Sequence, residues 1–429
     1  MELRGFVASF ASLIFSLALF LPLPLAAAEI NFQSDTILRL LERDTTTDDS
    51  AAVVPLYEYL QADVGGSGED GLSFHLYGWG RWDMADNNYF EDSVESELLY
   101  GYLEYNGEQA NFRTRLGRQY IFSGVANETV DGLSVRSDLG KYFSGSVYAG
   151  LPVAYADSNG RDGDSVFGGR IANHLPGWYD LGLSYQKVRS DSQDAEEKAG
   201  LDLSAYLPYA VNLYGFSAYN LDSEEFSEHS YELRFAAGPV QLRPYFQYFQ
   251  YDDYFANSAE GVNPFPALAT SGEELSVLGA EATLPALGSW TLIANLKQYN
   301  YDVLDDTALY YSGRAIWTSD KDNLLGGEVG IMDGDESRNQ YVLFRVFGDW
   351  RQLPEMLPFT SLSSELVYVD YDQPIYGEDS SLFISVGVSR MFLNDALECR
   401  LSGDFSQDPY YDEDLRGMLS LNYRFGTNL

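Results

Sequence analysis

The residues best placed to do chemistry are basic side chains that alternate with apolar ones. Arg113 and Arg115 stand between Phe112 and Leu116, and the segment Leu72 to Asp83 alternates in the same way. Successive residues of a β-strand point to opposite faces, so each such segment has one polar and one apolar face. The basic residues on the polar parity are Arg81, Arg113, Arg115, Arg136, Arg170, Arg234, Arg243, Lys297, Arg314, Arg345, Arg400 and Arg416.

Charged side chains gathered around a water-filled pore select ions, so these residues predict a pore lining with a preference for anions. A charge on a lipid face costs roughly 2 to 4 kcal/mol at the midplane, which favours the inward assignment. The same parity places His75, Tyr77 and Trp79 in the pore. The alternative is that the arginines pair with carboxylates of the same face and brace the wall; these are Glu104, Glu232, Glu398 and Asp404.

Catalysis and cofactor binding have little support in the sequence. The three histidines, His75, His174 and His229, lie in separate segments with no nucleophile pattern or metal-ligand spacing beside them. Cys399 is the only cysteine, which excludes an intramolecular disulfide and a Cys-x-x-Cys-His haem site. We therefore expect no catalytic residue, no bound metal and no cofactor.

The longest predicted loop, Asp252 to Gly272, is a candidate constriction. It contains Phe255, Pro264, Phe265 and Pro266, a mixture too apolar for a freely solvated tip. The loop could fold into the barrel and narrow it, cover the mouth, or pack on other loops.

The elements that must position these residues are strands. Alternating segments of about 9 to 13 residues follow one another as far as Phe425, a length that suits a tilted strand crossing a bilayer. Together they predict an all-β fold, a transmembrane antiparallel up-and-down β-barrel. About 21 segments follow Pro55, and since such barrels normally have an even count, Thr36 to Arg43 predicts an additional first strand. We favour 22 strands, with 18 or 20 as alternatives.

Residues 1–28 form a separate unit. Arg4, an apolar run from Phe6 to Leu25 and the small residues Ala26 to Ala28 are typical of a secretory signal peptide. The alternative is an uncleaved membrane anchor. We expect a mature barrel of residues 29–429 in the bacterial outer membrane, in contact with lipid and lipopolysaccharide.

The predicted connections alternate between short and long. Short ones include 207–210, 237–239 and 392–395, whereas the long ones include the acidic segments Arg189 to Lys198 and Asp370 to Ser380. Short periplasmic turns and longer outer loops show this alternation. The formal net charge of -39 makes nucleic acid an improbable partner.

Arg118 is an exception, because it falls on the lipid parity of its strand beside Gly117. Either a β-bulge re-aims the side chain, or the side chain reaches back to the membrane interface.

The signal, the alternating strands and the ending Tyr423 to Phe425 resemble Gram-negative outer-membrane barrel proteins, although four residues follow Phe425. More narrowly, Ser73 to Arg81, Leu116 to Gln119 and Asp131 to Leu133 resemble segments of porin-like proteins from metal-respiring bacteria. This resemblance implies one of two functions. The first is a porin-like channel for passive passage of small hydrophilic solutes or ions. The second is a structural sleeve around multihaem c-type cytochromes in an electron conduit.

Overall fold

The computed structural model describes residues 29–43, 51–65, 70–85, 89–90, 92–107, 111–153, 164–190, 193–251, 272–334, 340–353, 357–409 and 411–428. The predicted signal peptide lies outside these residues. The strands are β1 (Glu29–Arg43), β2 (Ala51–Val53), β3 (Pro55–Val64), β4 (Gly71–Asp83), β5 (Val94–Asn106), β6 (Phe112–Ser123), β7 (Ala126–Asp138), β8 (Phe143–Pro152), β9 (Ser165–Leu175), β10 (Tyr179–Ser190), β11 (Gln193–Leu207), β12 (Val211–Asn220), β13 (Glu225–Ala237), β14 (Val240–Gln250), β15 (Glu274–Leu287), β16 (Trp290–Tyr301), β17 (Asp306–Thr318), β18 (Leu324–Gly334), β19 (Tyr341–Trp350), β20 (Ser361–Ile375), β21 (Glu378–Phe392), β22 (Leu397–Asp408) and β23 (Tyr411–Asn428). A short 3-10 helix, η3 (Pro208–Ala210), joins β11 to β12.

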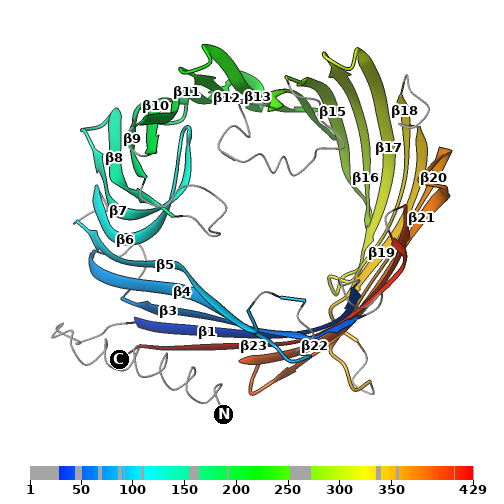
Figure 1. The fold of residues 1–429 in the computed structure, drawn as a ribbon. Helices are drawn as coiled ribbons and strands as arrows, with labels where there is room; N and C mark the ends of the chain where they lie inside the picture. The colour runs from blue at the N-terminus through cyan, green and yellow to red at the C-terminus, as the bar shows by residue number, and fades with distance from the viewer. Residues whose placement is uncertain are drawn as a thin grey trace.

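The strands form one closed antiparallel barrel, which Figure 1 shows as a ring. The first and last strands close the ring, with Glu29 opposite Asn428 and Leu41 opposite Arg416. Because β2 and β3 follow each other along the same edge of β1, the wall has 22 strands. The predicted fold class, the favoured strand count and the additional first strand are therefore confirmed. The described residues contain no helix long and apolar enough to span a membrane.

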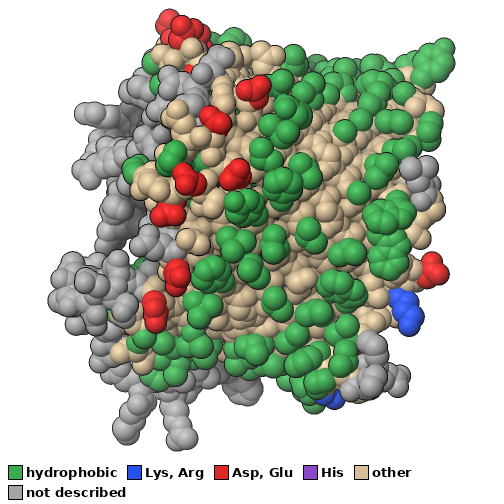
Figure 2. All heavy atoms as spheres, turned by 90° about the vertical axis from the view of Figure 1, so that its right-hand side faces the viewer, with side chains coloured by type: hydrophobic (Ala, Val, Ile, Leu, Met, Phe, Trp, Pro, Cys, Tyr) green, Lys and Arg blue, Asp and Glu red, His purple; other side chains and the backbone are tan. Residues whose placement is uncertain are grey.

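The outer face of the wall is apolar. Figure 2 shows hydrophobic side chains spread over the outer surface, with acidic ones toward one edge. Val329, Phe344 and Val346, which point outward from β18 and β19, are 48%, 46% and 53% exposed. A closed barrel leaves no unpaired strand edge, and an apolar exterior suits lipid. The chain is thus a β-barrel of the bacterial outer membrane.

Both described ends of the chain lie at the same end of the barrel, which we call the terminal end; we call the other the loop end. The predicted short connections 207–210, 237–239 and 392–395 are confirmed and lie at the terminal end. In outer-membrane barrels the short turns face the periplasm. The long loops predicted at 189–198 and 370–380 are wrong: pairing continues to Ser190–Gln193 and to Ile375–Glu378. Each of the two ladders has a register shift before its last pair, between Val188 and Arg189 and between Asp370 and Ile375.

Candidate functional site in the lumen

The β6–β7 hairpin leaves the wall and enters the barrel. β5 pairs with β6 only from Gly101 to Asn106, and β7 pairs with β8 only as far as Val130. The tip of the hairpin, residues 119–128, pairs with neither β5 nor β8, and Figure 1 shows it inside the ring. At the tip, the backbone N–H of Val125 donates to the hydroxyl of Ser184 on β10 at 3.1 Å. The hairpin therefore crosses the inner face of β8 and β9 and narrows the lumen.

A small apolar core holds the hairpin against the wall. Ile121, Ala126 and Val130 pack with side chains of three wall strands, which are Tyr148 of β8, Val166 of β9 and Val188 of β10. All six are at most 8% exposed. Burial of this apolar surface stabilises the inserted position.

Polar contacts extend this attachment. The Tyr148 hydroxyl donates to Gln186 at 3.2 Å, and the Gln186 amide donates to Glu128 of the hairpin at 3.4 Å. Buried Gln119 accepts from Ser134 at 2.5 Å and donates to the Gly132 carbonyl at 3.2 Å. The buried polar groups of the hairpin are thus hydrogen-bonded, as stable burial requires.

Glycine allows the wall strands to approach each other where the hairpin begins to bend. Gly117 has a φ of 124°, in the left-handed half of conformational space, and a Cβ there would lie 2.3 Å from the Gly101 carbonyl oxygen. A Cβ at Gly132, its neighbour on β7, would lie 2.2 Å from the Ala149 carbonyl oxygen. Only glycine fits both positions without a shift of backbone.

Tyr148 identifies the inner face of the wall, because it packs against the inserted hairpin. Cross-strand neighbours share a face, and Tyr148 lies opposite Ser134, which in turn lies opposite Arg115. Following the register around the ring in this way puts all the basic residues predicted for the pore on the face of Tyr148. His75, Tyr77 and Trp79 share this face through Tyr102 and Tyr100.

Most of these basic residues have carboxylate partners. This is the arrangement expected if the arginines brace the wall. The closest contacts include Arg115–Glu104 at 2.5 Å, Arg345–Glu365 at 2.6 Å and Arg314–Glu328 at 2.7 Å. The other pairs among the described residues are Arg345–Glu328, Arg81–Glu95, Arg170–Asp202, Arg170–Asp180, Arg234–Glu232, Arg243–Glu232, Arg243–Glu281 and Arg416–Asp414. Arg400 donates to the Ser363 hydroxyl at 2.8 Å, and Lys297 lies 5.8 Å from the ring centre of Tyr310.

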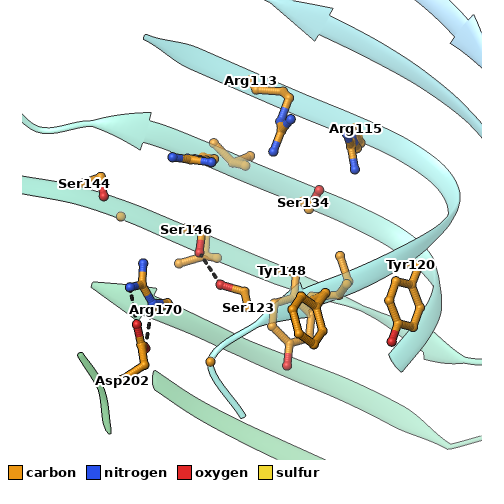
Figure 3. A pocket seen from close by; sticks show the side chains of 17 residues that line it. Arg113, Arg115, Tyr120, Ser123, Ser134, Ser144, Ser146, Tyr148, Arg170 and Asp202 are labelled. Carbon is orange, nitrogen blue, oxygen red and sulfur yellow. Dashed lines mark hydrogen bonds and ion pairs between the residues drawn. The ribbon is translucent and has the colours of Figure 1, made fainter. Parts of the chain in front are cut away.

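Arg113 and Arg136 differ from the other arginines. They lie directly opposite each other on β6 and β7, and neither has a carboxylate partner among the described residues. Both line a cavity of about 430 Å³ between the hairpin and the inner wall, together with Arg115 and Arg170 (Figure 3). The hydroxyls of serines 123, 134, 144 and 146 also line it. The cavity thus combines two uncompensated positive charges with several hydrogen-bond donors.

Arg170 closes the far side of this cavity. Its Nε and Nη2 donate to the two carboxylate oxygens of Asp202 at 2.9 and 2.5 Å, and Nη2 also donates to Asp180 at 3.0 Å. This two-point contact fixes the guanidinium plane. Arg170 is therefore neutralised, and the uncompensated charge belongs to Arg113 and Arg136.

Arg118 uses neither of the two arrangements expected for it. No register shift occurs at Gly117, so the side chain keeps the parity opposite to Arg115. Its guanidinium binds both carboxylate oxygens of Asp131 at 2.8 Å and donates to the Leu98 carbonyl at 2.9 Å. A cross-strand carboxylate thus neutralises the charge.

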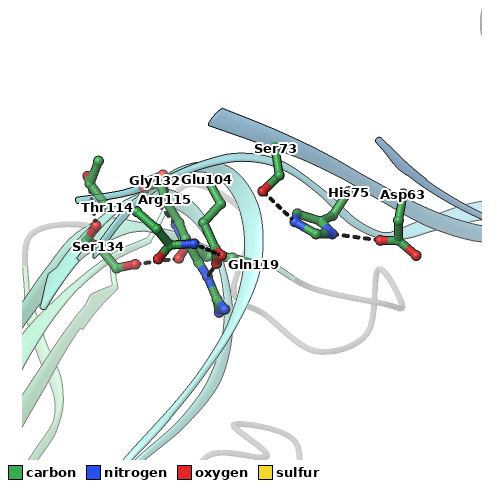
Figure 4. A network of polar contacts seen from close by, with 10 residues as sticks. Asp63, Ser73, His75, Glu104, Thr114, Arg115, Gln119, Gly132 and Ser134 are labelled. Atoms are coloured by element: carbon green, nitrogen blue, oxygen red, sulfur yellow. Dashed lines mark hydrogen bonds and ion pairs between the residues drawn. The ribbon is translucent and has the colours of Figure 1, made fainter. Parts of the chain in front are cut away.

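A row of hydrogen bonds at the terminal end was not predicted. His75 Nε2 lies 2.9 Å from the Ser73 hydroxyl, and His75 Nδ1 lies 2.6 Å from Asp63, as Figure 4 shows. Ser73 and His75 are each only 4% exposed, whereas the Asp63 side chain is 20% exposed, so the row opens toward the lumen at Asp63. The pairing of β3 with β4 brings Asp63 opposite His75, and an alternation pattern holds no information about such register. Within the described residues no group of three or more His, Cys, Asp and Glu side chains could hold a metal ion.

The predicted constriction residues, Phe255, Pro264, Phe265 and Pro266, lie outside the described residues. Sequence reasoning missed the β6–β7 hairpin as the inserted element. One feature of the sequence could have indicated this hairpin. Arg118 is a charged residue on the parity assigned to lipid, and it lies beside Gly117, where the hairpin begins to bend.

No family model matches the chain, and no curated protein matches it. Solved porin structures are distant neighbours. OccAB4 of Acinetobacter baumannii aligns over 94% of this chain and 100% of its own, at 10% identity and a TM-score of 0.47. A BenF-like porin from Pseudomonas fluorescens Pf-5 aligns over 93% of this chain and 99% of its own, at 13% identity and a TM-score of 0.45. OccK2 (OpdF) of Pseudomonas aeruginosa, solved in complex with glucuronate, aligns over 93% of this chain and 98% of its own, at 12% identity and a TM-score of 0.45. At this level of similarity, these neighbours carry no argument about function.

Proposed function

We propose that the protein is a passive channel of the outer membrane through which small hydrophilic solutes and ions diffuse. The inserted hairpin narrows the path, and Arg113 and Arg136 bind anionic groups of passing solutes beside it. The observation that carries the proposal is this uncompensated arginine pair on the polar inner face of a closed barrel.

The charge of the whole chain does not oppose local anion binding. The net charge of -39 is distributed over many side chains, whereas exposed charges more than about 10 Å apart are largely screened at 0.1 M salt. A carboxylate or phosphate between Arg113 and Arg136 would relieve the repulsion between two like charges on neighbouring strands. Serine hydroxyls of the cavity would complete its hydrogen bonds.

The test is the conductance of the purified barrel in planar lipid bilayers. We expect stepwise, long-lived conductance in potassium chloride, and partial block when inorganic phosphate or citrate is added. A correctly folded barrel that gives no steps would refute the channel. Conductance without any effect of these anions, at concentrations that saturate weak sites, would refute the arginine site alone.

The sleeve around a multihaem cytochrome stays a prediction from the sequence resemblance. No contact among the described residues favours it over the open channel.

A further inference from the structure

A continuous row of aromatic rings lies on the inner face of β3, β4 and β5, outside the arginine cavity. Its members are Trp79, Tyr57, Tyr59, Tyr77, Tyr100 and Tyr102, in order of contact, and we call it the aromatic track. Ring centres of successive members are 6.1, 6.3, 6.4, 5.4 and 5.7 Å apart. His75 stacks on the last ring at 4.9 Å.

The track runs along the direction of passage. Its ends are marked on β4 by Trp79, toward the loop end, and by His75, toward the terminal end. Four residues of strand correspond to roughly 13 Å. Each of the six aromatic side chains is half-buried, so part of its surface remains open. The track is thus long enough to contact more than one ring of a solute.

Planar polar side chains border the track on β1 and β3. In the register, Gln61 lies opposite Tyr77 and Asp35 lies opposite Tyr59. The Gln33 amide donates to Asp35 at 2.7 Å, and the Gln61 amide donates to Asp63 at 2.9 Å. A cavity of about 240 Å³ opens beside Gln33, Gln61 and Asp63 near the terminal end. Amide and carboxylate groups therefore lie next to an apolar stacking surface.

We propose that the aromatic track binds neutral oligosaccharides. A sugar ring has an apolar face of C–H groups that packs on an aromatic ring, and a rim of hydroxyls that donate to carboxylates and exchange hydrogen bonds with amides. The track and its border supply these two surfaces side by side. Charges of both signs border the track. Asp35 and Asp63 lie beside it, whereas Arg39 lies 5.5 Å from the ring centre of Tyr57, Arg115 lies 5.0 Å from that of Tyr102, and Arg424 lines the same cavity as Asp63. This mixed border favours no net charge in the sugar, and its donors and acceptors suit hydroxyl groups.

Packing of the wall alone does not account for this arrangement. Cross-strand aromatic pairs do stabilise sheets, and each pair here contributes in that way. However, the rings face the water-filled lumen, form one uninterrupted row, and end in tyrosines and a tryptophan whose polar atoms suit a wet surface. An apolar surface exposed in a row beside hydrogen-bonding groups is typical of a binding site.

The test is isothermal titration of the full-length barrel with maltohexaose, in a detergent that has no sugar head group. Tyr77→Ala and Tyr100→Ala should each weaken binding by roughly tenfold, because each removes a stacking surface. Tyr100→Phe keeps the ring and should bind nearly as well as the unmodified protein. The matched control is Tyr311→Ala, since Tyr311 lies on the opposite, outer face of β17 and is 41% exposed.

Absence of binding to the unmodified barrel at millimolar maltohexaose would overturn the proposal, and so would equal binding by Tyr77→Ala, Tyr100→Ala and Tyr311→Ala. Binding of phenol but not of the sugar would also overturn it. If the alanine variants do not assemble, Gln61→Ala leaves the rings intact and should still weaken binding. The titration measures binding and does not depend on conductance. A barrel that conducts ions but does not bind the sugar therefore refutes only this proposal. A sugar-binding barrel without conductance refutes only the channel.

Discussion

Arg113 of β6 and Arg136 of β7 lie directly opposite each other on the inner face of the barrel, and neither has a carboxylate partner among the described residues. Like charges on opposite positions of neighbouring strands destabilise a sheet. The other charged residues beside them are compensated, as Arg115 is by Glu104 and Arg170 is by Asp202. This exception is the basis of the anion site that we propose.

Arg113→Gln and Arg136→Gln should each weaken block by phosphate by a factor of roughly 10 to 100, as expected for loss of one charge-assisted contact of about 1.5 to 3 kcal/mol. Each should also lower the permeability of chloride relative to potassium. The measurements are phosphate titrations and reversal potentials in a salt gradient. Arg351→Gln is the charge-matched control, because Arg351 is exposed at the terminal end beyond β19. Equal shifts in all three variants would contradict a local site.

Ile121→Ala should loosen the inserted hairpin. The substitution removes buried methyl groups from the core against Tyr148 and Val188, which costs about 2 to 4 kcal/mol. We expect a higher mean conductance and more current fluctuations in single-channel recordings. Leu133→Ala, on the outer face of β7 where Leu133 is 48% exposed, should leave both quantities unchanged. If Ile121→Ala has the same mean conductance and the same current fluctuations as the unmodified protein, the hairpin does not limit the pore.

Gly117→Ala should impair assembly of the barrel. The new Cβ would lie 2.3 Å from the Gly101 carbonyl oxygen, and the backbone φ of 124° is strained for any residue with a Cβ. The expected loss is at least about 2 kcal/mol in the free energy of unfolding, measured by urea titration in lipid vesicles. Gly313→Ala is the control, because a Cβ there would meet nothing within 4 Å. Equal stability of both variants would contradict the close approach of β5 and β6.

Asp131→Asn should destabilise the base of the hairpin by leaving the Arg118 charge without its carboxylate. Asp131 shares the outer parity of Arg118 and binds its guanidinium at two points, so the midpoint of unfolding in urea should fall. The double variant Arg118→Gln with Asp131→Asn should lose less than the sum of the two single variants. A double-mutant cycle on urea unfolding measures this coupling. Additive losses would mean that the two side chains do not interact.

The sequence determined the fold class because alternation has a direct physical reading. A period of two residues assigns every side chain to one of two faces, and a chain of such segments with an apolar outer face closes into a barrel. Even the first strand, whose alternation is weak, could be predicted, because an odd number of strands would place the two ends of the chain on opposite sides of the membrane. Thr36 to Arg43 lies within β1, which pairs with β23 to close the ring.

Only the tertiary structure decided where the chain departs from that regular pattern. The hydrogen bond between Val125 and Ser184 joins residues 59 positions apart, so no local pattern encodes the inserted hairpin. The partner of each arginine likewise depends on strand register, and a slip of a single position would exchange the two faces. Alternation therefore assigns charges to a face, whereas register decides that Arg115 is neutralised and that Arg113 and Arg136 are not.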